Sequence, residues 1–224
     1  MFRAMVVKEW RETRGIALLG LAAYAYLLAT IVYPRLPFGI GIRQNLVVPF
    51  VRDTFVGWFI FISVIMTVAL GLRQTLGESI RGTYPFLLHR PASRRWLIGV
   101  KLLVGMGLYL VFGAAPIVAY GLWAATPGTH ASPFEWSMTV PVWSFWFIVT
   151  LLYLGAFLTG IRPGRWYGSR LLPLVAAGLA VGFAAGLSFS FSFSGAIWPS
   201  LVIFVVDVWI IAMILFVART RDYP

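Results

Sequence analysis

Six apolar stretches, each about as long as a bilayer-spanning helix, constrain this chain more than any other feature of its sequence. A hydrocarbon core about 30 Å thick needs roughly 20 helical residues. The stretches that meet this length are residues 15–33, 54–72, 97–123, 138–160, 171–188 and 197–217. Backbone polar groups in lipid must be paired within the protein, and the alternating pattern of a membrane barrel is missing. We therefore predict an all-α integral membrane protein, with residues 1–224 forming a single transmembrane domain.

The composition supports this class and excludes several kinds of chemistry. Hydrophobic residues make up 60% of the chain and charged residues 11%, whereas a soluble domain has about 25% charged residues. The chain has no cysteine, which excludes disulfides, thiolate metal sites and cysteine nucleophiles. His89 and His130 both lie outside the predicted spans, so we expect neither a metal site nor Ser–His catalysis in the membrane.

The positive charges predict how the chain is oriented. Of the 18 Lys and Arg residues, all but Arg35, Arg43 and Arg52 flank the spans on one side of the predicted topology. The positive-inside rule then puts both termini and the segment 73–96 in the cytoplasm of a multi-pass protein of the cell membrane. This distribution also explains the net charge of +11 without a nucleic-acid partner.

The first 14 residues have an amphipathic helical pattern. One face carries Phe2, Met5, Val6 and Trp10, and the charged residues lie elsewhere around the helix. This pattern is typical of a helix lying in the headgroup region of the membrane, and we predict such an interfacial helix over residues 1–14. The alternative is an ordinary charged flank that holds the first span in place.

The segment 73–96, RQTLGESIRGTYPFLLHRPASRRW, is a long polar segment with a helical pattern of its own. Leu76, Ile80, Tyr84, Leu87 and Leu88 recur at near-helical spacing, and two prolines interrupt the pattern. Such a pattern is expected of a short helix that docks against another surface.

Within this segment the sequence reads E-x-x-x-G-T-x-x-F-L-L-x-x-P-x-S-R from Glu78 to Arg94, followed by Lys101. Together with the order of the spans, the interfacial helix and, more weakly, Lys8-Glu9 and Arg14, it resembles the type-2 permeases of ATP-binding-cassette (ABC) transporters. The layout covers nearly the whole chain, whereas the residue-level likeness is confined to this segment and the residues before the first span.

The resemblance implies that segment 73–96 contains a coupling helix that docks on a separate ATPase subunit. The residues it assigns to that interface are Glu78, Arg81, Gly82, Thr83, Phe86, Leu87, Leu88, Pro91, Ser93 and Arg94. Charged side chains there can pair with a soluble partner while the apolar ones fill a groove. Pro85 departs from the family pattern and implies a shorter or kinked helix. A generic basic cytoplasmic loop is the alternative.

The chain has no nucleotide-binding motif of its own, because G-x-x-x-x-G-K-[ST] occurs nowhere in it. The resemblance therefore implies a non-enzymatic permease that takes up no cofactor, with ATP and Mg²⁺ bound by the partner ATPase. It also implies a second permease copy and a hydrophobic or amphipathic substrate. The other function we consider is a non-catalytic structural or sensory subunit of a membrane complex.

Two features within the spans are candidate functional positions. Gly178, Gly182 and Gly186 are spaced four apart and offer a flat face to another helix, either inside the chain, which we slightly favour, or at the seam with a second copy. Asp207 lies near the middle of the sixth span, where a carboxylate costs about 2.5–3.5 kcal/mol to insert. We expect it to be protonated or to pair with a hydroxyl such as Tyr109, Thr150 or Tyr153, in a structural role or along the substrate path.

Overall fold

The computed structural model describes residues 2–33, 48–51, 54–81, 93–129, 133–162, 167–190 and 197–220, and the regular structure among them is helical. Six helical stretches of these residues are long and apolar enough to cross a membrane, which confirms the predicted number of spans. The described part of the chain is thus the all-α bundle expected of a multi-pass membrane protein.

The spans follow one another along the chain, and the fourth of them is built from three pieces. The elements are α1 (Phe2–Val32), α2 (Thr54–Arg81), α4 (Arg94–Ala125), the 3₁₀-helix η2 (Trp136–Thr139) with α5 (Val140–Ile148) and α6 (Thr150–Ile161), then α7 (Tyr167–Ser190) and α8 (Ile197–Thr220). The two pieces α5 and α6 are separated by Val149 alone, so the fourth span is interrupted near its middle.

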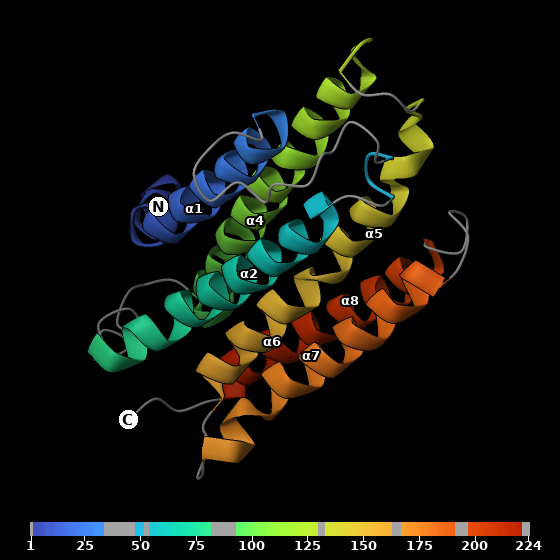
Figure 1. The fold of residues 1–224 in the computed structure, drawn as a ribbon. Coiled ribbons are helices and arrows are strands. Elements are labelled where there is room, and N and C mark those ends of the chain that lie inside the picture. Colours follow the sequence, from blue (N-terminus) through green and yellow to red (C-terminus); the bar gives the residue numbers. More distant parts are fainter. Residues whose placement is uncertain are drawn as a thin grey trace.

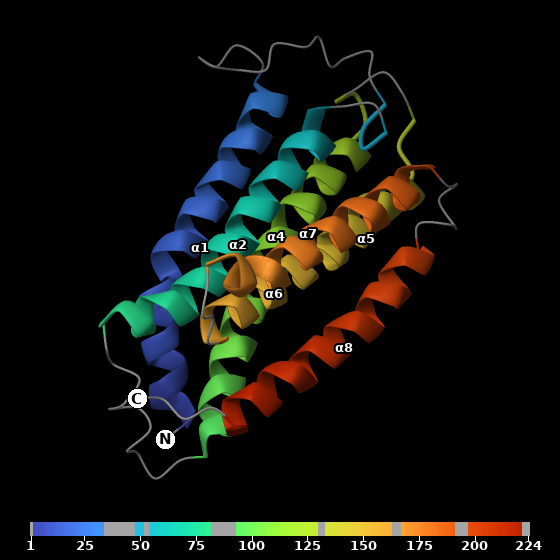
Figure 2. The ribbon, with the colours of Figure 1, turned by 90° about the horizontal axis from the view of Figure 1, so that it is seen from below.

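The fourth span lies inside the bundle (Figure 1). It is the most buried of the six, whereas α7 and α8 are among the least buried. Its α6 half packs against α2, α7 and α8, and its α5 half packs against α8, α7 and α4. Figure 2 shows that the start of α1, the start of α4 and the end of α8 lie at the same end of the bundle.

Close backbone approach fixes α6 between its neighbours. A Cβ added to Gly71 of α2 would lie 2.7 Å from the carbonyl oxygen of Tyr153, and one added to Gly155 would lie 2.6 Å from the Cβ of Ala177 on α7. Any side chain at these two glycines would therefore push helices apart. At the end of α6, the guanidinium of Arg170 lies 3.4 Å from the carbonyl oxygen of Thr159, where a cation suits the exposed carbonyls of a helix C-terminus.

The structure does not show a separate interfacial helix among the described N-terminal residues. Residues 2–14 continue without a break into the first span, as part of α1. Met5, Glu9, Thr13 and Ala17 are buried along one face of this helix, which packs against α4 and α2. Of the predicted apolar face only Met5 is buried, while Phe2 and Trp10 are exposed, so the contact with the neighbouring helices is made by a different stripe in which every fourth residue faces the bundle.

The three glycines of α7 do not form the contact inside the chain that we slightly favour from the sequence. Gly178, Gly182 and Gly186 are all exposed, and a Cβ built at Gly182 or Gly186 would meet no atom within 4 Å. Helix α7 instead turns Ala177, Val181 and Ala184 towards the rest of the bundle. The small-residue contact with α6 is made by Gly155 against Ala177, and a seam between two copies at the exposed glycines stays a prediction.

Candidate functional site

The predicted ATPase-interface residues lie at and between the ends of α2 and α4. Glu78 and Arg81 belong to the last turn of α2, and Arg94 begins α4. Ser93 is the N-cap of α4, where its hydroxyl accepts a hydrogen bond from the backbone N–H of Trp96 at 3.3 Å. The other residues assigned to this interface, Gly82, Thr83, Phe86, Leu87, Leu88 and Pro91, lie outside the described residues. A coupling helix in segment 73–96 is therefore untested by the structure.

A buried ion pair joins the first and third spans. The ammonium of Lys101 on α4 donates a hydrogen bond to Glu9 Oε1 on α1 at 2.8 Å, although 92 residues separate the two in sequence. Their side chains are 1% and 0% exposed, respectively. Lys8, which is one-third exposed, has its ammonium 3.7 Å from the same carboxylate oxygen. Two charges buried this deeply are tolerated only as a pair, because each alone would cost several kcal/mol.

A second set of hydrogen bonds extends the ion pair to the second and fourth spans. The side-chain amide of Gln74 on α2 donates to the backbone carbonyl of Lys101 at 2.8 Å. The hydroxyl of Tyr153 on α6 lies 2.6 Å from Gln74 Oε1 and 3.1 Å from the carbonyl oxygen of Leu102. We call Glu9, Lys101, Gln74 and Tyr153 the four-helix cluster, because they come from α1, α4, α2 and α6.

The backbone of α4 is shaped to admit this cluster. A Cβ at Gly105 would collide with Gln74 Oε1 and would lie 2.5 Å from the hydroxyl of Tyr153. Glycine at this position leaves the space that the amide and the phenol occupy. The four-helix cluster is thus a built feature of the bundle, in which hydrogen bonds connect four helices.

Sequence reasoning singled out Lys101 and Glu9 separately and did not pair them. Both were noted as matches to the permease pattern, whereas Gln74 received no role and Tyr153 appeared only as a possible partner of Asp207. The signal that could have joined them is charge: Lys101 interrupts an apolar stretch, and an acid at a buried position of a neighbouring helix is its expected partner.

Asp207 is buried on α8 and pairs with Thr150, one of the three hydroxyls suggested by the sequence. Asp207 is 5% exposed, and its Oδ2 lies 2.5 Å from Thr150 Oγ1. Its other oxygen, Oδ1, is buried and has no hydrogen-bond partner among the described residues. A carboxyl group held this way faces the interior of the bundle, at the junction of α5 and α6.

The interruption of the fourth span is stabilised by side chains from two directions. The hydroxyl of Tyr109 on α4 donates to the carbonyl oxygen of Trp146 at 2.8 Å, and Thr150 Oγ1 lies 2.6 Å from the carbonyl oxygen of Phe147. Val149 keeps a right-handed helical conformation, and its backbone N–H bonds to the carbonyl oxygen of Phe145 at 3.1 Å, so the interruption is a local distortion of the helix. We call Thr150, Asp207 and the carbonyl oxygen of Phe147 the break site.

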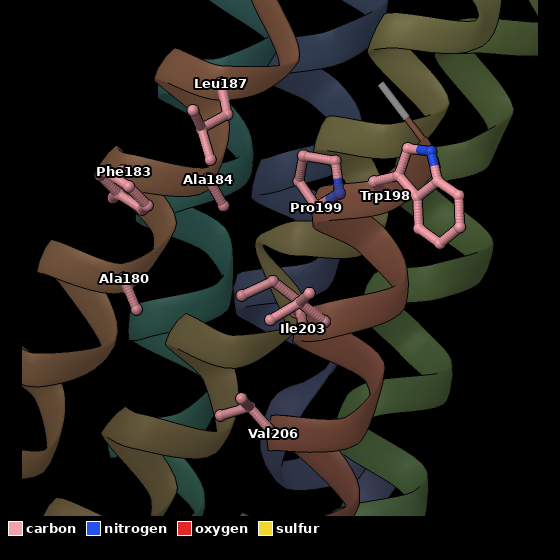
Figure 3. A pocket seen from close by; sticks show the side chains of 9 residues that line it. Ala180, Phe183, Ala184, Leu187, Trp198, Pro199, Ile203 and Val206 are labelled. Carbon is pink, nitrogen blue, oxygen red and sulfur yellow. The ribbon is translucent and has the colours of Figure 1, made fainter. Parts of the chain in front are cut away.

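An apolar groove of about 460 Å³ separates parts of α7 and α8 (Figure 3). Ala184 and Leu187 from α7 face Ile203 and Val206 from α8 across this space. The complete lining is Ala180, Phe183, Ala184, Leu187, Trp198, Pro199, Val202, Ile203 and Val206. No charged side chain lines the groove, so it suits an apolar chain and would exclude an ion.

The described residues contain no candidate metal site, and the comparisons with known proteins find no relative. In the described ranges, no group of three or more His, Asp and Glu side chains could hold a metal ion. Comparison of the chain with protein-family models, with curated proteins and with solved structures finds no match.

Proposed function

We propose that this chain is the membrane-spanning permease subunit of an ABC transporter. It moves a hydrophobic or amphipathic molecule across or out of the membrane, using ATP that a separate subunit hydrolyses. The observation that carries the proposal is the four-helix cluster, because it links α2 and α4, whose ends form the two ends of segment 73–96, to two further spans.

A permease driven by a soluble partner must pass a displacement at its cytoplasmic segment into its membrane helices. Helix α2 is unbroken up to Arg81, and α4 begins directly after Ser93. Gln74 and Lys101 each lie seven residues inside these helices, which is about 10 Å along a helix axis. A push at the segment therefore reaches the cluster through two continuous helices, and the cluster carries it to α1 and α6.

In this proposal the bundle end with the starts of α1 and α4 faces the cytoplasm, as the Lys and Arg distribution predicts. The chain has no cysteine, so single cysteines can test the orientation directly. We expect a membrane-impermeant maleimide to label Glu135→Cys on whole cells and to label Arg3→Cys only after the membrane is opened. Labelling of Arg3→Cys on intact cells would contradict the orientation.

The substrate class follows from the apolar groove between α7 and α8. Its lining offers contact area for an acyl chain or another apolar group and no partner for a charge. A polar part of the substrate would have to stay near the membrane surface or in a path formed with a second copy. The partners of the chain are then an ABC ATPase subunit, which binds ATP and Mg²⁺, a second permease copy and the lipid bilayer.

The decisive experiment is purification of the tagged chain in mild detergent from its native host, with identification of what co-purifies. We expect a polypeptide with a P-loop motif, in equal amount with the chain, and ATP hydrolysis by the complex. The Glu78→Arg and Leu87→Asp double variant should lose this subunit, because both changes fall in the predicted coupling segment.

Glu135→Arg is the matched control, since it reverses an exposed charge at the predicted outer surface. It should leave the complex intact. If wild-type chain recovers no ATPase, or if the double variant keeps it, the permease proposal fails. A stable complex with membrane proteins that lack a nucleotide site would then favour the structural or sensory subunit.

A further inference from the structure

In the break site the hydroxyl oxygen of Thr150 makes two short contacts with other oxygen atoms, and its single proton can serve only one of them. Thr150 Oγ1 lies 2.5 Å from Asp207 Oδ2 and 2.6 Å from the carbonyl oxygen of Phe147. A threonine hydroxyl carries a single proton, so it can donate to one of these neighbours and must accept from the other. The carbonyl oxygen cannot donate. Both short contacts are hydrogen bonds only if Asp207 supplies the second proton.

We infer that Asp207 is a proton-binding site, with its proton on Oδ2 donated to Thr150, whose own proton is donated to the carbonyl oxygen of Phe147. This arrangement pairs every atom in the row. It also leaves Oδ1 as the carbonyl oxygen of a neutral acid, which suits an atom that is buried without a partner among the described residues.

The ionised alternative leaves more unpaired. A carboxylate at Asp207 would take the proton of Thr150, and the carbonyl oxygen of Phe147 would lose that donor at the interruption of the helix. The negative charge would be stabilised by one hydroxyl, with Oδ1 buried and unpaired. A buried carboxyl group without a cationic partner becomes neutral instead of paying this cost.

Among the described residues, no Lys or Arg side chain forms an ion pair with Asp207. Helix α8 packs against α4, α5, α6 and α7. Lys101 is paired with Glu9, and Arg170 with carbonyl oxygens at the end of α6. The hydroxyl of Tyr109 donates to the carbonyl oxygen of Trp146, and the hydroxyl of Tyr153 donates to Gln74 Oε1. The remaining titratable residues of these elements lie near helix ends or at the outer half of α4: Arg94, Arg95, Tyr120, Tyr167 and Arg219.

Proton release would change the break site in a defined way. When Asp207 loses its proton, the hydroxyl of Thr150 turns from the carbonyl oxygen of Phe147 to the carboxylate. The carbonyl oxygen of Phe147 then loses the hydroxyl as a donor and keeps the backbone N–H of Val149. Proton occupancy on α8 is thereby linked to the geometry of the interrupted fourth span, and this linkage does not depend on the proposed ATPase partner.

Infrared difference spectroscopy of the chain in lipid nanodiscs tests the inference. At neutral pH, the spectrum of wild type minus Asp207→Asn should contain the C=O stretching band of a protonated carboxylic acid, shifted in D₂O. Thr150→Val should keep the band and move it to higher frequency, since the acid loses the hydroxyl that accepts its hydrogen bond. Glu135→Gln, which alters an exposed acid, should leave the band unchanged.

The amide of Asp207→Asn can donate to Thr150 as the protonated acid does, so this variant should fold. If it does not, Asp207→Glu replaces it, and the band should persist with a changed frequency. Loss of the wild-type band with rising pH, together with growth of a carboxylate band, would establish reversible binding. Absence of a protonated-acid band at neutral pH, or a band that survives in Asp207→Asn, would overturn the inference.

Discussion

Replacing Lys101 by methionine tests the buried ion pair most directly. Methionine is close to lysine in length and keeps the apolar stem, while the ammonium that donates to Glu9 at 2.8 Å is lost. The hydrogen bond from Gln74 to the backbone of residue 101 is unaffected, because it uses the carbonyl oxygen. The substitution therefore isolates the charge from the packing and from the backbone contact.

The expected cost follows from the depth and geometry of the pair. Opposite charges 2.8 Å apart attract by about 6 kcal/mol at an effective dielectric constant near 20, and desolvation offsets part of this. Removing one partner of a buried pair typically costs about 3–5 kcal/mol. Lys8, 3.7 Å from the same oxygen, remains as a second cation for Glu9, so we expect the lower end, about 3 kcal/mol.

Thermal unfolding in mild detergent, followed by the fluorescence of the ten tryptophans, gives the measurement. A loss of about 3 kcal/mol corresponds to a Tm lower by roughly 6–12 °C in a chain of this size. Glu9→Met should destabilise similarly. The double variant should recover most of the loss, since two apolar side chains replace the pair without leaving a buried charge. Single variants as stable as wild type, or a double variant whose loss equals the sum, would refute the reasoning.

Three further substitutions test the packing and the polar contacts. Gly155→Val should lower the free energy of unfolding by about 1–3 kcal/mol or more through overpacking. Gly107→Val is the control and should be close to neutral in the same unfolding assay, because a Cβ added at Gly107 meets no atom within 4 Å. Tyr153→Phe should lower stability by about 1–3 kcal/mol, because the buried carbonyl of Gln74 loses its donor at 2.6 Å. Gly182→Leu should leave thermal stability unchanged and reduce cross-linking between two copies; unchanged cross-linking would contradict a dimer seam at this face.

The spans could be predicted from the sequence because the physical constraint on them is local. A helix in lipid needs a minimum length and apolar side chains, and both can be read without knowing its neighbours. The boundary of α1 could not be predicted in the same way. An amphipathic pattern indicates that one face of the helix is kept from water. Either the headgroup region of the membrane or a neighbouring helix can cover such a face. In the structure Met5 and Glu9 are buried against other helices while Phe2 and Trp10 of the predicted apolar face stay exposed.

The polar contacts within the bundle depended on tertiary packing and could only be partly predicted. The need of Asp207 for a partner followed from its position, and Thr150 was among three candidates. Glu9 and Lys101 could be paired only through their opposite charges, because nothing in the local sequence brings positions 92 residues apart together. For α7 the spacing of glycines predicts a face that another helix can approach, and in the structure a Cβ added at Gly182 or Gly186 meets no atom within 4 Å. Which direction that face points depends on how the neighbouring helices are placed.

The four-helix cluster and the break site meet on a single turn of α6. Tyr153 belongs to the four-helix cluster, and Thr150, three residues earlier, belongs to the break site. Tyr153 and Thr150 lie one helical turn apart on α6, so a displacement of α6 carried from α2 through Gln74 would move both residues. The reverse also holds, so a change of proton occupancy at Asp207 would be felt at Gln74. Buried charges and acids in lipid are costly, and a chain that places both on the turn adjoining its broken helix gains a means of linking the two halves of its bundle.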